Sequence, residues 1–182
     1  MTMSGVLWIT GLSGAGKTTL AKRVVRALRE DDAFGHGGVV HVDGDKMREI
    51  LGSDLGHDAK DRRTNAWRIA RTCAFLAGEG CFVVCSTMSM FQEIWTHNRQ
   101  AFDPYLEVLL AVPVEVLKKR DTKGIYRAGV RNVAGVDLEV TWPQTPDLVL
   151  SSEGEGDLAR NAALLVGRAR DMRCGFTSRR TA

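Results

Sequence analysis

The chain has 182 residues, of which 44% are hydrophobic and 26% are charged, and its formal net charge is +3. This length predicts one domain with a proper buried core, and the composition is that of an ordinary globular protein. The small net charge does not indicate a nucleic acid polymer as partner, and no apolar run approaches the length of a membrane span, so a membrane is not expected either.

The cysteines of the chain indicate the redox state of its cellular compartment. Cys73, Cys81, Cys85 and Cys174 lack the spacing of metal ligands and indicate no disulfide framework. Free thiols are typical of a reducing environment, and no signal peptide is recognised at the N-terminus. A cytoplasmic location is therefore expected.

Strand-like and helical stretches alternate along the chain. The strand-like runs are 6–9, 39–42, 81–85, 106–112 and 148–150. The helical stretches are 19–29, 46–51, 63–77, 91–102, 114–120 and 157–172, the last capped by Asp157. This order predicts an α/β fold, with a mostly parallel five-stranded sheet, right-handed crossovers and helices on both faces. Ligands of such sheets bind at the carboxyl ends of the strands.

No repeat or linker divides the chain, so a single domain over 1–182 is expected. Residues 121–146 are polar, glycine-bearing and weakly periodic. An unstructured stretch of this length is unusual in a compact domain unless it is functional, which predicts a lid. The last residues, about 173–182, are rich in arginine and are interpreted as a basic tail.

The most informative motif follows the first strand. Gly11-Leu12-Ser13-Gly14-Ala15-Gly16-Lys17-Thr18 fits G-x-x-x-x-G-K-[ST], the phosphate-binding loop, between a strand and a helix as that motif requires. Its amides form a nest for an anion. Lys17 is then expected beside the β- and γ-phosphates of ATP, and the Thr18 hydroxyl is expected to bind Mg²⁺. Thr19 is included in the nucleotide-binding loop.

Two carboxylates follow the second strand, at the same predicted edge. Phosphoryl transfer depends on positioning and charge neutralisation, and it also needs a group that accepts or orients the proton of the acceptor hydroxyl. Asp43 and Asp45 are the candidates. The alternative is structural, with Asp43 as a turn residue and Asp45 as the cap of the next helix.

A second polar group comprises Arg48 and the series Arg62, Asn65 and Arg68, whose spacing sets them roughly along one side of a helix. Arginines there are suited to an anionic substrate, because the guanidinium binds such groups bidentately. The alternative is a solvated helix face. His57 has no partner ligands at a spacing that predicts a metal site.

Taken together, the motifs resemble those of the adenylyl-sulfate kinases (APS kinases) over about residues 6–150. Besides the phosphate loop, these are D-G-D-x-x-R at 43–48, D-R-x-x-N at 61–65 and R-D-x-K-G-[LI]-Y at 120–126. The resemblance implies a P-loop kinase fold and transfer of the γ-phosphoryl group of MgATP to the ribose 3′-hydroxyl of a small anionic nucleotide, most like adenylyl sulfate. A homodimer is compatible with the resemblance, although no stretch of the sequence indicates one.

The resemblance also implies roles for individual residues. Asp45 would orient or deprotonate the acceptor hydroxyl, with Asp43 beside it. The acceptor nucleotide would be held by Arg48, Arg62 and Asn65, with Ser89 matching the serine of the family's I-S-P element. Arg120 and Lys123 would lie on the lid over the two nucleotides.

The sequence departs from the APS kinases on the acceptor side. His57 and Val133 stand where the family has two phenylalanines that sandwich the acceptor's adenine. The shortened lid and Asn98-Arg99 resemble instead the cytidine diphosphoramidate kinases, so a cytidine-based acceptor is the second hypothesis. A third, of another class, is a P-loop ATPase switch without a small acceptor.

Overall fold

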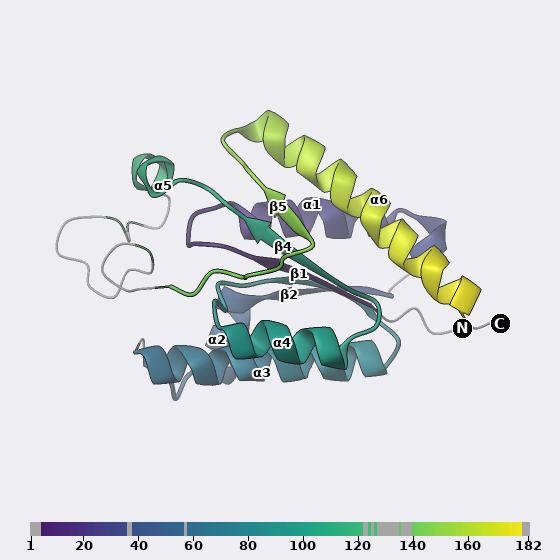
Figure 1. Cartoon of the computed structure of the whole chain (residues 1–182), viewed down its shortest axis with the longest axis horizontal. Helices are drawn as coiled ribbons and strands as arrows, with labels where there is room; N and C mark the ends of the chain where they lie inside the picture. The colour runs from purple at the N-terminus through teal and green to yellow at the C-terminus, as the bar shows by residue number, and fades with distance from the viewer. Residues whose placement is uncertain are drawn as a thin grey trace.

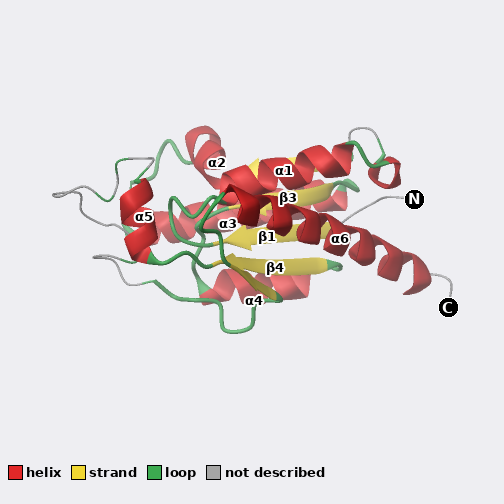
Figure 2. Ribbon diagram, turned by 90° about the horizontal axis from the view of Figure 1, so that it is seen from above, coloured by secondary structure: helices red, strands yellow, loops and turns green. Residues whose placement is uncertain are grey.

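The computed structural model describes residues 5–35, 38–56, 58–121, 124, 126, 135 and 140–179, with side chains up to residue 173. Its described strands form one five-stranded parallel sheet between two layers of helices (Figure 1). The start of β1 (Gly5–Thr10) and the end of α6 (Glu155–Arg179) lie at one end of the molecule, and helix α5 (Val114–Arg120) lies at the other (Figures 1 and 2). The α/β fold predicted from the alternation is confirmed.

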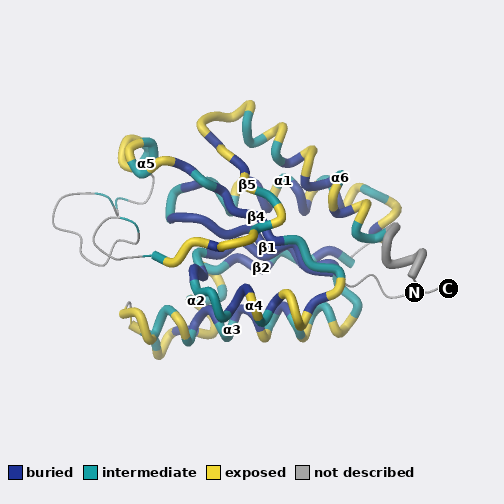
Figure 3. Tube along the Cα trace, viewed as in Figure 1, coloured by how far each residue is buried: buried dark blue, intermediate teal, exposed yellow. Residues whose placement is uncertain are grey.

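The strands are β1 (Gly5–Thr10), β2 (Val39–Asp43), β3 (Phe82–Ser86), β4 (Tyr105–Leu110) and β5 (Leu148–Leu150). Their order across the sheet is β2-β3-β1-β4-β5, and every pairing is parallel. The central strands β1 and β3 are buried throughout (Figure 3), as expected of apolar runs covered on both faces. This order brings the chain segments that follow β1, β2 and β3 together at one edge.

Helices α1 (Lys17–Arg29) and α6 (Glu155–Arg179) cover one face of the sheet, and α3 (Ala59–Gly78) and α4 (Gln92–Ala101) cover the other (Figure 1). Helix α2 (Gly44–Leu51) begins directly at the end of β2. The core between the layers includes the fully buried side chains of Trp8, Leu20 and Ile69. The buried stripes of α1 and α3 repeat at helical spacing, which is why these stretches pack as helices on the sheet.

Helices α3 and α6 extend beyond the stretches predicted for them. Helix α3 begins at Ala59 rather than residue 63, because the Asp58 carboxylate accepts a hydrogen bond from the amide of Asp61 and caps the added turn. Asp157 does not cap α6: it lies in the first turn and its carboxylate accepts a hydrogen bond from the amide of Glu153. The same helix continues to Arg179, into the segment expected to be a tail.

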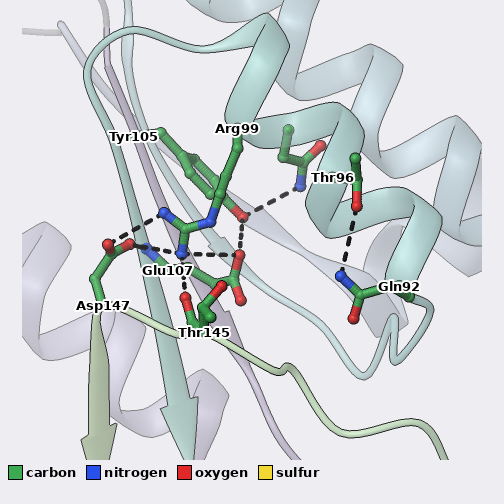
Figure 4. A network of polar contacts seen from close by, with 8 residues as sticks. Gln92, Thr96, Arg99, Tyr105, Glu107, Thr145 and Asp147 are labelled. Carbon is green, nitrogen blue, oxygen red and sulfur yellow. Dashed lines mark hydrogen bonds and ion pairs between the residues drawn. The ribbon is translucent and has the colours of Figure 1, made fainter.

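A polar network fixes β5 against β4 near their amino ends (Figure 4). The Arg99 guanidinium of α4 binds both carboxylate oxygens of Asp147, at 3.1 and 3.2 Å, and the carbonyl oxygen of Thr145 at 2.7 Å. Arg99 also lies 3.4 Å from the buried carboxylate of Glu107, which accepts a hydrogen bond from Tyr105. Arg99 therefore ties the chain entering β5 to the sheet.

Among the described helices, none has both the length and the apolar character that crossing a membrane requires. Cys73, Cys81 and Cys85 are free thiols.

Candidate functional site

The loops that follow β1, β2, β3 and β5 enclose a pocket of about 440 Å³ at the carboxyl edge of the sheet. Parallel α/β sheets bind their ligands at this edge. Four segments share the lining, which comprises residues 13, 14 and 16–19, residues 43–45, residues 86–88 with Arg120, and residues 152–155 with Leu158. The phosphate loop, Asp43 and Asp45, which were predicted from separate stretches, therefore lie together.

The loop from Gly11 to Thr18 joins β1 to α1 as the motif predicted. Gly11 has a φ of +147°, and a Cβ there would lie 2.5 Å from the carbonyl oxygen of Leu110, so the close approach of β4 requires glycine. Lys17 Nζ donates to the carbonyl oxygens of Gly11 and Leu12, at 2.9 and 2.8 Å. The ammonium group is thus held against its own loop, in a position to contact an anion bound there.

Asp43 joins β2 to the phosphate loop. Its Oδ2 accepts a hydrogen bond from the Thr18 hydroxyl at 2.7 Å, and its Oδ1 accepts from the amides of Asp45 and Lys46 and so caps α2. Burial acts to raise the pKa of Asp43, but the hydrogen bonds from Thr18 and from these amides, with His41 nearby, hold it below its ordinary value. The carboxylate is therefore ionised, and its Oδ2 is directed at Thr18.

Asp45 lies in the first turn of α2, and it is exposed on the wall of the same pocket. The α2 helix starts here because Asp43 caps it, so the cap fixes where the second carboxylate stands. Asp43 faces Thr18, whereas Asp45 lines the pocket from the first turn of α2. The structural alternative gave the cap of this helix to Asp45, but the cap is Asp43, which also lines the pocket.

Of the described residues predicted for the acceptor, Asp45 lines this pocket, whereas Arg48, Arg62, Asn65 and Ser89 are not among its lining residues. Arg48 donates to the carbonyl oxygens of Leu55 and Gly56, in the loop after α2. Asn65 of α3 is 9% exposed, and its Oδ1 is buried without a hydrogen-bond partner among the described residues. Such an orphaned acceptor is suited to a polar ligand.

Other acceptor-side predictions have mixed outcomes. Ser89 is buried and its hydroxyl lies 2.9 Å from that of Thr87, while Arg62 is half-buried on α3. Arg68 instead binds Asp54 through both guanidinium nitrogens, which anchors the loop after α2. His57, Lys123 and Val133 lie outside the described residues. Asn98 and Arg99 lie near the amino end of β4, away from the pocket, and so do not form part of the acceptor site.

Arg120 ends α5 and lines the pocket, and its guanidinium donates to the carbonyl oxygen of Ser152 at 2.8 Å. Sequence reasoning missed the loop that contains Ser152, although it follows β5 at the carboxyl edge and that position was a usable signal. The loop contributes Ser152, Glu153, Gly154 and Glu155 to the pocket wall.

The segment expected to be a lid contacts the phosphate loop through two of its described residues. The Tyr126 hydroxyl donates to the carbonyl oxygen of Ser13 at 2.7 Å. A Cβ on Gly135 would lie 2.9 Å from a methyl carbon of Leu12, so this glycine packs closely on the loop. Tyr126 and Gly135 therefore pack against the phosphate loop.

Comparison with known proteins settles the family. A model of the adenylylsulphate kinase family matches residues 3–151. The chain belongs to this family. The adenylyl-sulfate kinase of Halothermothrix orenii is 37% identical over 153 residues, 82% of this chain and 80% of that protein. The cytidine diphosphoramidate kinase of Campylobacter jejuni subsp. jejuni serotype O:2 is 34% identical over 165 residues, 88% of this chain and 94% of that protein.

A solved structure agrees with these relatives. The APS kinase CysC of Mycobacterium tuberculosis, in complex with AMPPNP and APS, superposes with a TM-score of 0.81 at 30% identity, covering 92% of this chain and 98% of that one. This member of the adenylylsulphate kinase family is an ATP-dependent nucleotide kinase, as predicted from the sequence. The homodimer and the cytoplasmic location stay predictions, as do the roles of single residues.

Proposed function

We propose that this kinase transfers the γ-phosphoryl group of MgATP to the ribose 3′-hydroxyl of adenylyl sulfate. The supporting observation is that a carboxylate, Asp45, and the phosphate loop line one pocket. Phosphoryl transfer needs an acceptor hydroxyl in line with the γ-phosphate and a group that receives its proton. The pocket places a carboxylate that can receive this proton in the same space as the loop that binds the phosphates.

The donor half of the proposal rests on Lys17 and the loop amides. They neutralise charge on the β- and γ-phosphates, which in phosphoryl transfer is most of the protein's contribution. Lys17 leaves the carbonyl oxygens of Gly11 and Leu12 for the phosphates when ATP binds. Arg120 and the loop at Ser152 line the same pocket as Lys17 and hold the remainder of the nucleotide.

Magnesium fits the pair formed by Thr18 and Asp43. Mg²⁺ takes oxygen ligands, and a hydroxyl lying 2.7 Å from an ionised carboxylate oxygen supplies two such atoms. The ion, when bound, offsets the negative charge of the phosphates. We therefore assign Asp43 to holding the metal with Thr18, rather than to the acceptor hydroxyl.

On the acceptor side, Asp45 orients or deprotonates the hydroxyl, while Arg48, Arg62 and Asn65 hold the nucleotide's anionic and polar groups. The buried, unpartnered Oδ1 of Asn65 supports this role. Ser89 supports the wall behind them. Lys123, His57 and Val133 complete the acceptor side by position in the sequence.

A cytidine-based acceptor, cytidine diphosphoramidate, is the second candidate. It is favoured by His57 and Val133, which replace two aromatic rings expected around adenine. Stacking of a base on an aromatic ring contributes about 1–3 kcal/mol, so the loss of both rings weakens the preference for adenine. The relative from Campylobacter jejuni bears the name of such a kinase.

Incubation of the purified protein with MgATP and each acceptor separates the two. The proposal predicts that kcat/KM for adenylyl sulfate exceeds that for cytidine diphosphoramidate. Turnover of the cytidine compound with none of adenylyl sulfate would replace the first candidate by the second.

A further inference from the structure

His41 is a polar residue of β2 that neither the phosphate loop nor the acceptor side uses. Its Nε2 lies 2.9 Å from the hydroxyl of Ser86, the last residue of β3. The same hydroxyl donates to Asp43 Oδ2 at 3.2 Å, and Asp43 and Ser86 are paired in register across the two strands. His41, Ser86 and Asp43 thus form a hydrogen-bonded chain that ends at Thr18.

The donors along this chain follow from elementary bonding. An ionised carboxylate only accepts, so the single hydroxyl proton of Ser86 points at Asp43. Ser86 Oγ then has lone pairs left for His41, so Nε2 must carry the proton that it donates. If Ser86 instead donated its proton to His41, the lone pairs of its oxygen would face the Asp43 carboxylate. The imidazole is therefore held as one tautomer.

Four donors contact the Asp43 carboxylate. Oδ2 accepts from two hydroxyls, those of Thr18 and Ser86, and Oδ1 accepts from two backbone amides. Asp43 and Ser86 are 6% and 3% exposed. A buried carboxylate with this many donors has one orientation, and loss of a donor would free it to rotate.

His41 stands behind the pocket. Ser86 and Asp43 line it, whereas His41 is not among the lining residues. Contact with ATP is thus left to Ser86 and Asp43. His41 acts on Asp43 through the hydroxyl of Ser86 and also directly, because its Nε2 lies 4.0 Å from Asp43 Oδ2. A residue whose role was only to pack in the strand would not need a hydrogen bond to Ser86.

We propose that His41 is a positioning residue, which through Ser86 holds the Asp43 carboxylate in the orientation that binds the metal of MgATP. This inference rests on the metal role proposed for Asp43. Hydrogen-bonded partners of metal ligands typically change metal affinity by about 10–100-fold when they are removed.

The test measures Mn²⁺ affinity in the ternary complex with ADP by electron paramagnetic resonance, with metal-free ADP affinity measured by calorimetry. His41→Leu keeps the bulk and removes the donor, so Mn²⁺ affinity is expected to fall by about 10–100-fold with metal-free ADP affinity unchanged. His41→Gln keeps an N–H donor and should restore most of the affinity. Ser86→Ala should match His41→Leu, and the double variant should be no worse than either single one.

His97→Leu, at a half-buried histidine that packs on Trp67, is the matched control and should leave Mn²⁺ affinity unchanged. Unchanged Mn²⁺ affinity in His41→Leu, or an equal loss in His41→Gln, overturns the inference. Asp43→Asn tests the metal role of Asp43 separately from the positioning role of His41. If Mn²⁺ affinity falls in Asp43→Asn but not in His41→Leu, only the positioning role is overturned. If Mn²⁺ affinity does not fall in Asp43→Asn, the metal role is overturned as well.

Discussion

The Tyr126 hydroxyl donates a hydrogen bond to the Ser13 carbonyl oxygen, 2.7 Å away, and joins residues that lie 113 positions apart. The Tyr126 ring also lies near Gly14, since a Cβ on that glycine would be 3.8 Å from a ring carbon. Tyr126 is therefore held against the phosphate loop at Ser13 and Gly14. The lid over residues 121–146 stays a prediction, and Tyr126 is the described residue through which it would contact the loop.

Removal of the anchoring hydroxyl in Tyr126→Phe should raise the KM for ATP. One neutral hydrogen bond contributes about 0.5–1.5 kcal/mol, which corresponds to roughly a two- to tenfold change. Steady-state kinetics with varied ATP measure it. The control is Tyr105→Phe. Tyr105 is the other of the two tyrosines of the chain, and its hydroxyl donates a hydrogen bond to Glu107 near the amino end of β4, away from the phosphate loop. Equal KM values in wild type and Tyr126→Phe would contradict the anchor.

Asp45→Asn should separate chemistry from ATP binding. The amide keeps the shape of the carboxylate but does not accept the acceptor's proton, so kcat is expected to fall by about 10²–10⁴-fold. ATP affinity, measured by calorimetry, should change by less than about twofold, because the phosphates are bound by the loop. The control is Glu49→Gln, an exposed carboxylate one turn along the same helix. Retained transfer in Asp45→Asn would remove Asp45 from its role.

Two of the three glycines of the phosphate loop, Gly11 and Gly14, should respond differently to alanine. Both Gly11 and Gly14 have a positive φ, which costs an alanine about 1–2 kcal/mol. Only at Gly11 would the new Cβ also meet a backbone atom, at 2.5 Å, whereas at Gly14 its neighbours lie 3.8 Å away.

Thermal unfolding measures this difference. Gly14→Ala should lower the Tm by roughly 2–8 °C, and Gly11→Ala by at least about twice as much. Equal falls would mean that β4 does not press on the loop at Gly11.

The buried Glu107 should give the stability a pH dependence. Burial raises its pKa above the ordinary value of 4.5, although Arg99 and Tyr105 act in the opposite direction. The folded protein then holds this proton more tightly than the unfolded chain. Its contribution to stability is present below the unfolded value and is lost as the pH rises through the folded pKa.

Glu107→Gln cannot titrate, so wild type should lose stability relative to this variant between about pH 5 and about pH 7.5. Urea unfolding at the two pH values measures the difference, with the exposed Glu115→Gln as control. A wild-type-to-variant difference that is the same at both pH values would contradict the assignment.

The sheet and the phosphate loop could be predicted because their signals are local. Apolar runs such as 81–85 specify buried strands, and the spacing of glycines before Lys17 specifies the loop. The bond between Thr18 and Asp43 could not be predicted, because it depends on β2 and β1 being separated by β3 in the sheet. The loop at Ser152 was missed because it has no motif of its own, and only the position of β5 brings it to the pocket. Asp157 was misassigned because a cap and a first-turn carboxylate look alike in sequence.

The central claim is transfer of a phosphoryl group to a small nucleotide, and mass spectrometry of the products from MgATP and adenylyl sulfate tests it most directly. The expected products, in equal amounts, are ADP and a nucleotide that is heavier by one phosphoryl group, carried on the 3′-oxygen. Release of inorganic phosphate with adenylyl sulfate and cytidine diphosphoramidate both unchanged would contradict it, and would instead indicate an ATPase switch.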